Sequence, residues 1–177
     1  VAHSAGRGLE PSDQLDTWLR DAQRASERGF LVTARAILDF ARKIRPQEEE
    51  LWLASAALER EEGDDARLDA ILLQAVEACP QAEVLWLMAA KHKWRLQDVP
   101  AAREVLQRAF AANPNAEEIW LAASKLESEN GEVVRARKLL QRARERTNST
   151  RVWLKSALLE RNVMVRAQEM MKQVKEE

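Results

Sequence analysis

The sequence predicts an all-α fold, a right-handed solenoid of about five stacked helical hairpins. Three observations carry this prediction: a strict tryptophan period, small residues and prolines at fixed places within it, and a composition typical of ordered helical chains. Five of the six tryptophans stand 33 or 34 residues apart, namely Trp18, Trp52, Trp86, Trp120 and Trp153. We number the positions of each copy from its tryptophan, so that position 4 lies four residues after it.

Small side chains and prolines recur in register with the tryptophans. Position 4 carries Ala22, Ala56, Ala90, Ser124 and Ala157 in the five copies. Position 28 carries Pro46, Pro80 and Pro114 in the first three copies and Asn148 in the fourth. Because small residues let two helices approach closely while proline ends a helix, these positions predict one folded unit repeated along the chain.

The first helix of each copy is predicted around its tryptophan. In the second copy the apolar and small residues from Leu51 to Leu58 are spaced by three and four, which is one face of an α-helix. Glycine stands at position 11 in three copies, as Gly29, Gly63 and Gly131. Since glycine accepts the left-handed conformation common at helix ends, we expect the first helix to stop there.

A second helix is predicted after each of these turns. In the first copy its apolar stripe consists of Ala34, Ile37, Leu38 and Ala41. The proline at position 28 ends this helix, because proline has no N–H and disfavours the α conformation in the residue before it. Each copy is therefore expected to fold as helix, short turn, helix, short turn.

The predicted repeat domain covers residues 15–177, after a flexible leader at residues 1–14. The copies are expected at about 15–47, 48–81, 82–115, 116–149 and 150–177. The last is irregular, since the stretch from Glu160 to Arg166-Ala167 is two residues shorter than in the fourth copy and has no turn glycine. Its second helix is expected to be displaced or fused to the first. The chain reads as a segment of a longer protein.

Composition and single residues narrow the class of protein. With a net charge of −1 and no apolar run long enough to cross a bilayer, neither a membrane nor nucleic acid is expected to attract the chain as a whole. Cys79 is the only cysteine, which favours a buried structural thiol in a reducing compartment. His3 and His92 lie far apart in the sequence, and no catalytic constellation is apparent. We expect no enzyme activity, cofactor or metal.

Charged residues at two further positions carry a resemblance to a known repeat. Position 7 holds Glu59, Glu127 and Glu160, where a tetratricopeptide repeat usually has an aromatic residue. Position 17 holds Arg35, Arg103 and Arg137. Tryptophan, glutamate, arginine and proline in this order resemble the half-a-tetratricopeptide (HAT) repeat of RNA-processing proteins. Only the fourth copy has Trp120, Glu127 and Arg137 together, so a pair between Glu127 and Arg137 is expected inside that copy alone.

Longer stretches are similar to one family of HAT-repeat proteins, the pre-mRNA-processing factor 6 family. They include residues 82–88, 98–103 and 112–130, and the likeness extends from Asp16 to Met171. This resemblance implies a nuclear, non-enzymatic scaffold of the spliceosome. It also implies a role in holding the U4/U6 and U5 particles together in the tri-snRNP, with spliceosomal snRNP proteins as partners.

Two alternatives stay open at this point. The chain could serve another RNA-processing complex, or it could bind RNA directly through the basic helix that carries Arg135, Arg142 and Arg146. RNA is not expected to be the primary partner, because aromatic residues that could stack on bases are not interleaved with these arginines. Trp94, outside the tryptophan series, either caps the core or faces a partner. The irregular fifth copy offers an apolar face, so self-association is also an expectation.

Overall fold

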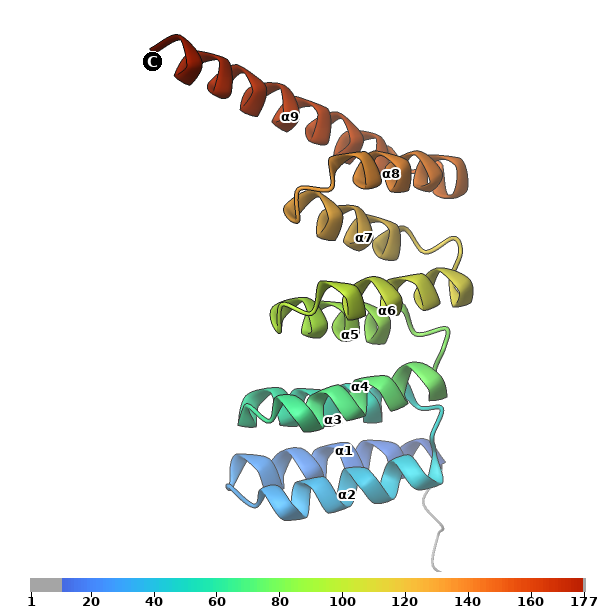
Figure 1. Cartoon of the computed structure of the whole chain (residues 1–177). Coiled ribbons are helices and arrows are strands. Elements are labelled where there is room, and N and C mark those ends of the chain that lie inside the picture. The colour runs from blue at the N-terminus through green and yellow to red at the C-terminus, as the bar shows by residue number, and fades with distance from the viewer. Residues whose placement is uncertain (1–10, 177) are drawn as a thin grey trace, which may run out of the picture. The chain divides into compact units, whose positions relative to one another are not determined.

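The structure of the chain, a computed structural model, describes residues 11–176, and every regular element in this range is an α-helix. The helices are α1 (Pro11–Glu27), α2 (Leu31–Ile44), α3 (Glu49–Glu62), α4 (Asp65–Ala78), α5 (Glu83–Arg95), α6 (Val99–Ala112), α7 (Glu117–Glu129), α8 (Val133–Thr147) and α9 (Thr150–Glu176) (Figure 1). The all-α class predicted from the sequence is confirmed.

The leader expected at residues 1–14 ends earlier than predicted. Helix α1 begins at Pro11, so residues 11–14 are helical. A proline is tolerated in the first turn of a helix, where its missing N–H would have no partner in the helix anyway. Residues 1–10 of the expected leader lie outside the described residues.

The chain divides into two compact units, residues 1–85 and residues 86–177, and the boundary falls inside α5. In the first unit α1 pairs with α2 and α3 pairs with α4, and in the second α7 pairs with α8. The hairpins predicted for the first, second and fourth copies are thus found, and the fifth copy differs from its prediction.

The turns inside the hairpins use the left-handed backbone conformation. Gly29, Gly63 and Gly131 have φ of +79°, +75° and +80°, as expected for glycines that end a helix. In the third copy Gln97 takes the same position with φ of +62°. Asn148, which replaces the proline of the fourth copy, has φ of +45° and caps the end of α8. The turn inside the hairpin is therefore kept at Gln97, whereas the end of α8 differs from the ends of α2, α4 and α6, whose caps at Arg45, Cys79 and Asn113 have negative φ.

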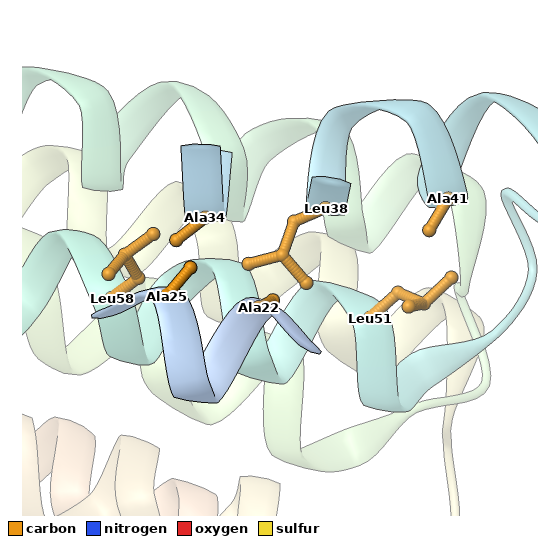
Figure 2. Close-up of a cluster of buried hydrophobic side chains, with 7 residues drawn as sticks. All are labelled: Ala22, Ala25, Ala34, Leu38, Ala41, Leu51 and Leu58. Atoms are coloured by element: carbon orange, nitrogen blue, oxygen red, sulfur yellow. The ribbon is translucent and has the colours of Figure 1, made fainter. Parts of the chain in front are cut away.

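The core of the first unit is built mainly from small residues. Its buried cluster consists of Ala22 and Ala25 from α1, Ala34, Leu38 and Ala41 from α2, and Leu51 and Leu58 from α3 (Figure 2). Ala34 and Ala41 have no exposed surface at all. Alanines at these positions let the helices pack closely, while Trp18 lies partly buried against the cluster. The predicted role of the small positions is confirmed here.

Buried tryptophans tie their own helix to the turn before it. Trp52 Nε1 donates a hydrogen bond to the Pro46 carbonyl oxygen at 2.7 Å, and Trp120 Nε1 donates to the Pro114 carbonyl oxygen at 3.0 Å. Both indole rings are buried, so each needs a partner for its N–H. The tryptophan and proline of the repeat signature are therefore one structural feature, in which the proline supplies an acceptor as well as a helix end.

The second unit has a corresponding core, formed where α7, α8 and α9 meet. Its buried members are Trp120, Leu121, Ala136, Leu140, Ala143, Val152 and Leu159. Phe110 of α6 packs on Trp120 with ring centroids 4.1 Å apart. Only the first part of α9 contributes to this core.

The fifth copy is one continuous helix, α9, of 27 residues. The second helix of this copy was expected to be displaced or fused to the first, and the structure shows that the two are fused. One consequence concerns Trp153, a member of the repeat signature. Its side chain is 54% exposed, whereas those of Trp52, Trp86 and Trp120 are buried. The reason is that no second helix returns along α9 to cover this ring. In Figure 1 the later half of α9 runs beyond α8.

Candidate binding groove

Arginine and glutamate of the repeat signature form ion pairs between successive copies. Arg35 binds Glu59 through two hydrogen bonds, Nε to Oε1 at 2.8 Å and Nη2 to Oε2 at 2.7 Å. Arg103 binds Glu127 through the same atoms at the same distances. The pair expected between Glu127 and Arg137 is therefore wrong. Arg137 instead binds Glu160 of the next copy, at 2.5 and 2.6 Å.

The three pairs differ in burial. Glu59 and Glu127 are buried, whereas both side chains of the Arg137–Glu160 pair are nearly half exposed. The hydrogen bonds to Glu59 and Glu127 raise the pKa of Arg35 and Arg103. The hydrogen bond from Arg137 lowers the pKa of Glu160. Two-pronged binding by a planar guanidinium fixes orientation, so each pair sets the register of one copy against the next.

Position 24 makes a second contact between copies, which the sequence analysis missed. The guanidinium of Arg42 lies over the Trp52 ring, 4.7 Å from its centroid, and that of Arg144 lies 4.5 Å from the centroid of Trp153. Phe110 makes the corresponding contact with Trp120. Position 24 holds Arg in the first and fourth copies, Phe in the third and Val76 in the second, so no shared residue type indicated the contact. Either kind of planar group can stack on an indole ring.

A groove of about 960 Å³ lies in the second unit. It is lined by the part of α5 that belongs to this unit, by α7 and by α9, with Leu106 of α6 and Leu140 of α8. These are the first helices of successive copies, with α9 in the place of the first helix of the fifth copy. Stacked hairpins present such a continuous surface because one helix of each pair faces the same side.

Basic side chains predominate around the groove. Seven cationic residues line it, Lys91, Arg95, Lys125, Arg151, Lys155, Arg161 and Arg166, against two acidic residues, Glu118 and Glu129. Arg151 binds Glu118, and Lys125 Nζ lies 3.7 Å from Glu129 Oε1. The apolar part of the lining is mostly leucine. The groove thus joins an aliphatic floor to a positively charged rim, although the whole chain is nearly neutral.

Trp94 is one of the residues that line this groove. Its side chain is half-buried and forms part of the lining. Lys125 Nζ stands 5.9 Å from the centroid of its ring. Trp94 is therefore accessible from the groove, and its contact with a partner stays a prediction.

The basic helix predicted as an RNA contact lies elsewhere. Arg135, Arg142 and Arg146 are exposed on α8, and none of them lines the groove. Arg135 Nε is 3.9 Å from Glu132 Oε2 in the same helix. These arginines belong to the second helices, so the structure separates the two surfaces that the sequence offered for binding.

The remaining candidate residues have structural surroundings. Cys79 is 8% exposed, with its Sγ 3.6 Å from the Pro46 carbonyl oxygen, and burial raises the pKa of the thiol. His92 is buried beside Arg95. Among residues 11–176, no group of three or more His, Cys, Asp and Glu is placed to hold a metal ion. No helix in that range has the length and apolar character needed to cross a membrane.

Comparisons with known proteins place this fold. A tetratricopeptide-repeat family model matches residues 87–161. Pre-mRNA-splicing factor prp1 of Schizosaccharomyces pombe (strain 972 / ATCC 24843) is 47% identical over 46 residues, which cover 26% of this chain and 5% of prp1. The match thus spans a small part of that relative.

Two solved structures, both crystal structures of MamA, share the fold. They superpose with TM-scores of 0.59 and 0.57, at 14% and 15% identity, covering 90% and 85% of this chain and 88% of each MamA chain. The chain is an all-α, tetratricopeptide-like solenoid. Repeats of this kind are protein–protein interaction scaffolds, because stacking gives them an extended binding surface.

Proposed function

We propose that the chain is a nuclear protein-interaction scaffold in pre-mRNA splicing, which helps to assemble or bridge the U4/U6.U5 tri-snRNP through contacts with snRNP proteins. The observation that supports protein binding is the groove of the second unit. The assignment to splicing is supported by the identity with prp1 and by the HAT-type order of Trp, Glu and Arg. Its role is to bind rather than to catalyse, and the groove lining holds neither Cys nor His.

The lining of the groove suits a protein segment better than RNA. Single-stranded RNA is bound without sequence preference by several aromatic side chains on which successive bases stack. Trp94 is the one aromatic residue in the lining, and the other apolar residues are aliphatic. Leucine side chains provide a surface for the apolar side chains of a peptide, which is what a protein partner supplies.

The charge of the groove indicates the chemistry of the partner. A rim with seven basic and two acidic residues attracts a segment that carries Asp or Glu. Because the charges on the rim are exposed, they are expected to act mainly on association, and binding should weaken moderately as salt rises. The partner segment is therefore proposed to combine acidic and apolar side chains.

A capture experiment with matched variants tests the proposal. Tagged chain is incubated with nuclear extract, with and without ribonuclease, and the bound proteins are identified by mass spectrometry. One variant carries Lys91→Glu, Lys125→Glu and Lys155→Glu in the groove. The other carries Arg135→Glu, Arg142→Glu and Arg146→Glu on α8. Both change three exposed cations to anions, so they differ in location and not in charge.

The expected result is that tri-snRNP proteins are recovered in the presence of ribonuclease, that the groove variant loses them, and that the α8 variant keeps them. Recovery that depends on intact RNA, or that is lost only in the α8 variant, would favour direct RNA binding instead. Recovery of proteins from another RNA-processing complex would keep the scaffold and replace the splicing assignment.

A further inference from the structure

Helix α9 carries a stripe of exposed apolar and small side chains along most of its length. Its members are Trp153, Ala157, Met164, Ala167 and Met171, all of them exposed. With Glu160 included, they are spaced by four, three, four, three and four residues. This spacing keeps them on one face of the helix, as in helices that pack along their length. The face extends over about 27 Å at 1.5 Å per residue.

The first half of this stripe is a surface that the other copies cover. At position 4, Ala22, Ala56, Ala90 and Ser124 are all buried, whereas Ala157 is exposed. Beside Trp153 and Ala157 lies a hollow of about 420 Å³ between α8 and α9. The guanidinium of Arg144 from the preceding copy lies over the Trp153 ring, and the side chain is still 54% exposed. The cover that it lacks is what a second helix of its own copy would supply.

The second half of the stripe resembles the second helices of the other copies in sequence. In three hairpins, positions 16 and 20 hold an alanine and a leucine that pack in the core: Ala34 and Leu38, Ala102 and Leu106, Ala136 and Leu140. In α9 the pair Ala167 and Met171 stands at positions 14 and 18, which correspond to 16 and 20 once the two-residue shortening of the fifth copy is allowed for. The same chain does not bring this pair back to Trp153, because Met164 stands where Gly131 turns the fourth copy and α9 continues through it.

We propose that two copies of this chain associate through α9, antiparallel, each covering the Trp153–Ala157 surface of the other with its own second half. The spacing along the stripe reads the same in both directions. An antiparallel pair therefore places Trp153 opposite Met171 of the second copy and Ala157 opposite its Ala167. Two alanines allow close approach of the helices, and a thioether packs well against an indole.

A second copy is the occupant that the sequence itself specifies. The second half of α9 resembles the second helices of the other copies in sequence, and a two-fold arrangement covers both exposed surfaces at once. Glu160, near the middle of the stripe, already has its charge balanced by Arg137, so packing near it does not leave a carboxylate without a partner. The proposed α9–α9 contact lies next to one already made within the chain, that of α8 with α9.

Sedimentation equilibrium over a wide range of protein concentration tests the association. The parent chain should reach a dimer, and Ala167→Arg should remove it by placing a charge within the interface, opposite Ala157 of the second copy. Val165→Arg is the matched control, because Val165 is also exposed on α9 but points away from the stripe, and this variant should dimerise like the parent. A parent chain that stays monomeric at all concentrations, or equal behaviour of the two variants, would overturn the proposal.

Disulfide cross-linking tests the antiparallel register. Ala157→Cys and Ala167→Cys are made in separate chains with tags of different size, mixed and oxidised. The expected product joins one chain of each kind, and neither variant alone should cross-link. Cys79 is buried, and the oxidised parent chain serves as its control. Cross-linking of the Ala157→Cys chain to itself would show a parallel pair and contradict the exchange. A dimer without the mixed product would do the same.

Discussion

The fourth and fifth copies begin alike and end differently. Both open with a tryptophan, a small residue at position 4 and a glutamate at position 7. In the fourth copy Gly131 turns the chain with φ of +80°, and α8 folds back on α7. In the fifth copy Met164 stands at that position and a single helix continues. The turn at position 11, rather than the apolar face of either helix, therefore decides whether a copy becomes a hairpin.

The burial of the tryptophan follows from that difference. Trp120 is 7% exposed and Trp153 is 54% exposed, although each lies at the same place in its first helix. The preceding copy contributes a stacked group in both cases, Phe110 for one and Arg144 for the other. What Trp153 lacks is therefore the contribution of its own second helix.

The two tryptophans should differ most when each is removed. Trp120→Ala is expected to lower the free energy of unfolding by about 3–5 kcal/mol, because it empties a large buried site and leaves the Pro114 carbonyl without its donor. Trp153→Ala should lower it by less than about 1 kcal/mol, because half of this ring is already in water. Urea unfolding followed by circular dichroism, at dilution that keeps both variants monomeric, measures the difference. Equal losses would contradict the assignment of Trp153 to an incomplete site.

The next contrast is between the ion pairs of these copies. Arg103→Met should destabilise the chain by about 2 kcal/mol, because it leaves the buried Glu127 carboxylate without its partner. Arg137→Met should destabilise the chain much less than Arg103→Met, since that pair is exposed on both sides. Thermal unfolding of both variants compares them, with Arg135→Met on α8 as a control for loss of one charge.

Replacing position 11 by alanine tests the role of the turn itself. Gly131→Ala should cost about 1 kcal/mol, because an alanine at positive φ is strained although the space around it is open. Met164→Ala should change stability by no more than about 0.5 kcal/mol, since this residue is exposed within a helix. Similar losses of stability in both variants would contradict the assignment of position 11 to a turn in the fourth copy and to a helix in the fifth.

The smallest effect concerns the titration of Glu160. Its pKa is lowered by the hydrogen bond from Arg137, so the pair contributes at neutral pH and is lost as pH falls through the depressed pKa, below the usual glutamate value of about 4.3. An NMR titration of the Glu160 carboxyl carbon should show this low pKa. In Arg137→Met it should return toward the usual value. An unchanged titration would mean that the pair does not form in solution.

The sequence predicted most of the fold, because the tryptophan period, the small positions and the turn glycines all act within one copy. It placed Gly29, Gly63 and Gly131 at the turns they occupy. It failed for the ion pairs, because an offset counted within a copy does not say which copy the partner belongs to. At the observed spacing of 24 residues, Asp69 and Lys93 also carry opposite charges, in the reverse order, a pattern visible in the sequence once the spacing is known.

The groove was harder to predict than the fold. Its basic residues come from α5, α7 and α9 and are scattered through the sequence, whereas Arg135, Arg142 and Arg146 lie close together on one helix and attracted the prediction. A local cluster of charge is easy to see in a sequence. A cluster assembled from three helices needs the stacking of the copies before its members can be counted together.

The ion pairs that join one copy to the next have a consequence for how such a chain can be rearranged. Because Arg103 lies in one copy and Glu127 in the next, neither copy is a self-contained module. A single copy moved into another array would bring a buried glutamate without its arginine, and would leave an arginine behind. A recombination event that cuts the chain between two copies separates the arginine from its glutamate. The fold is preserved only if the incoming copy supplies the matching partner, so the contacts between copies constrain rearrangement more than the contacts within a copy do.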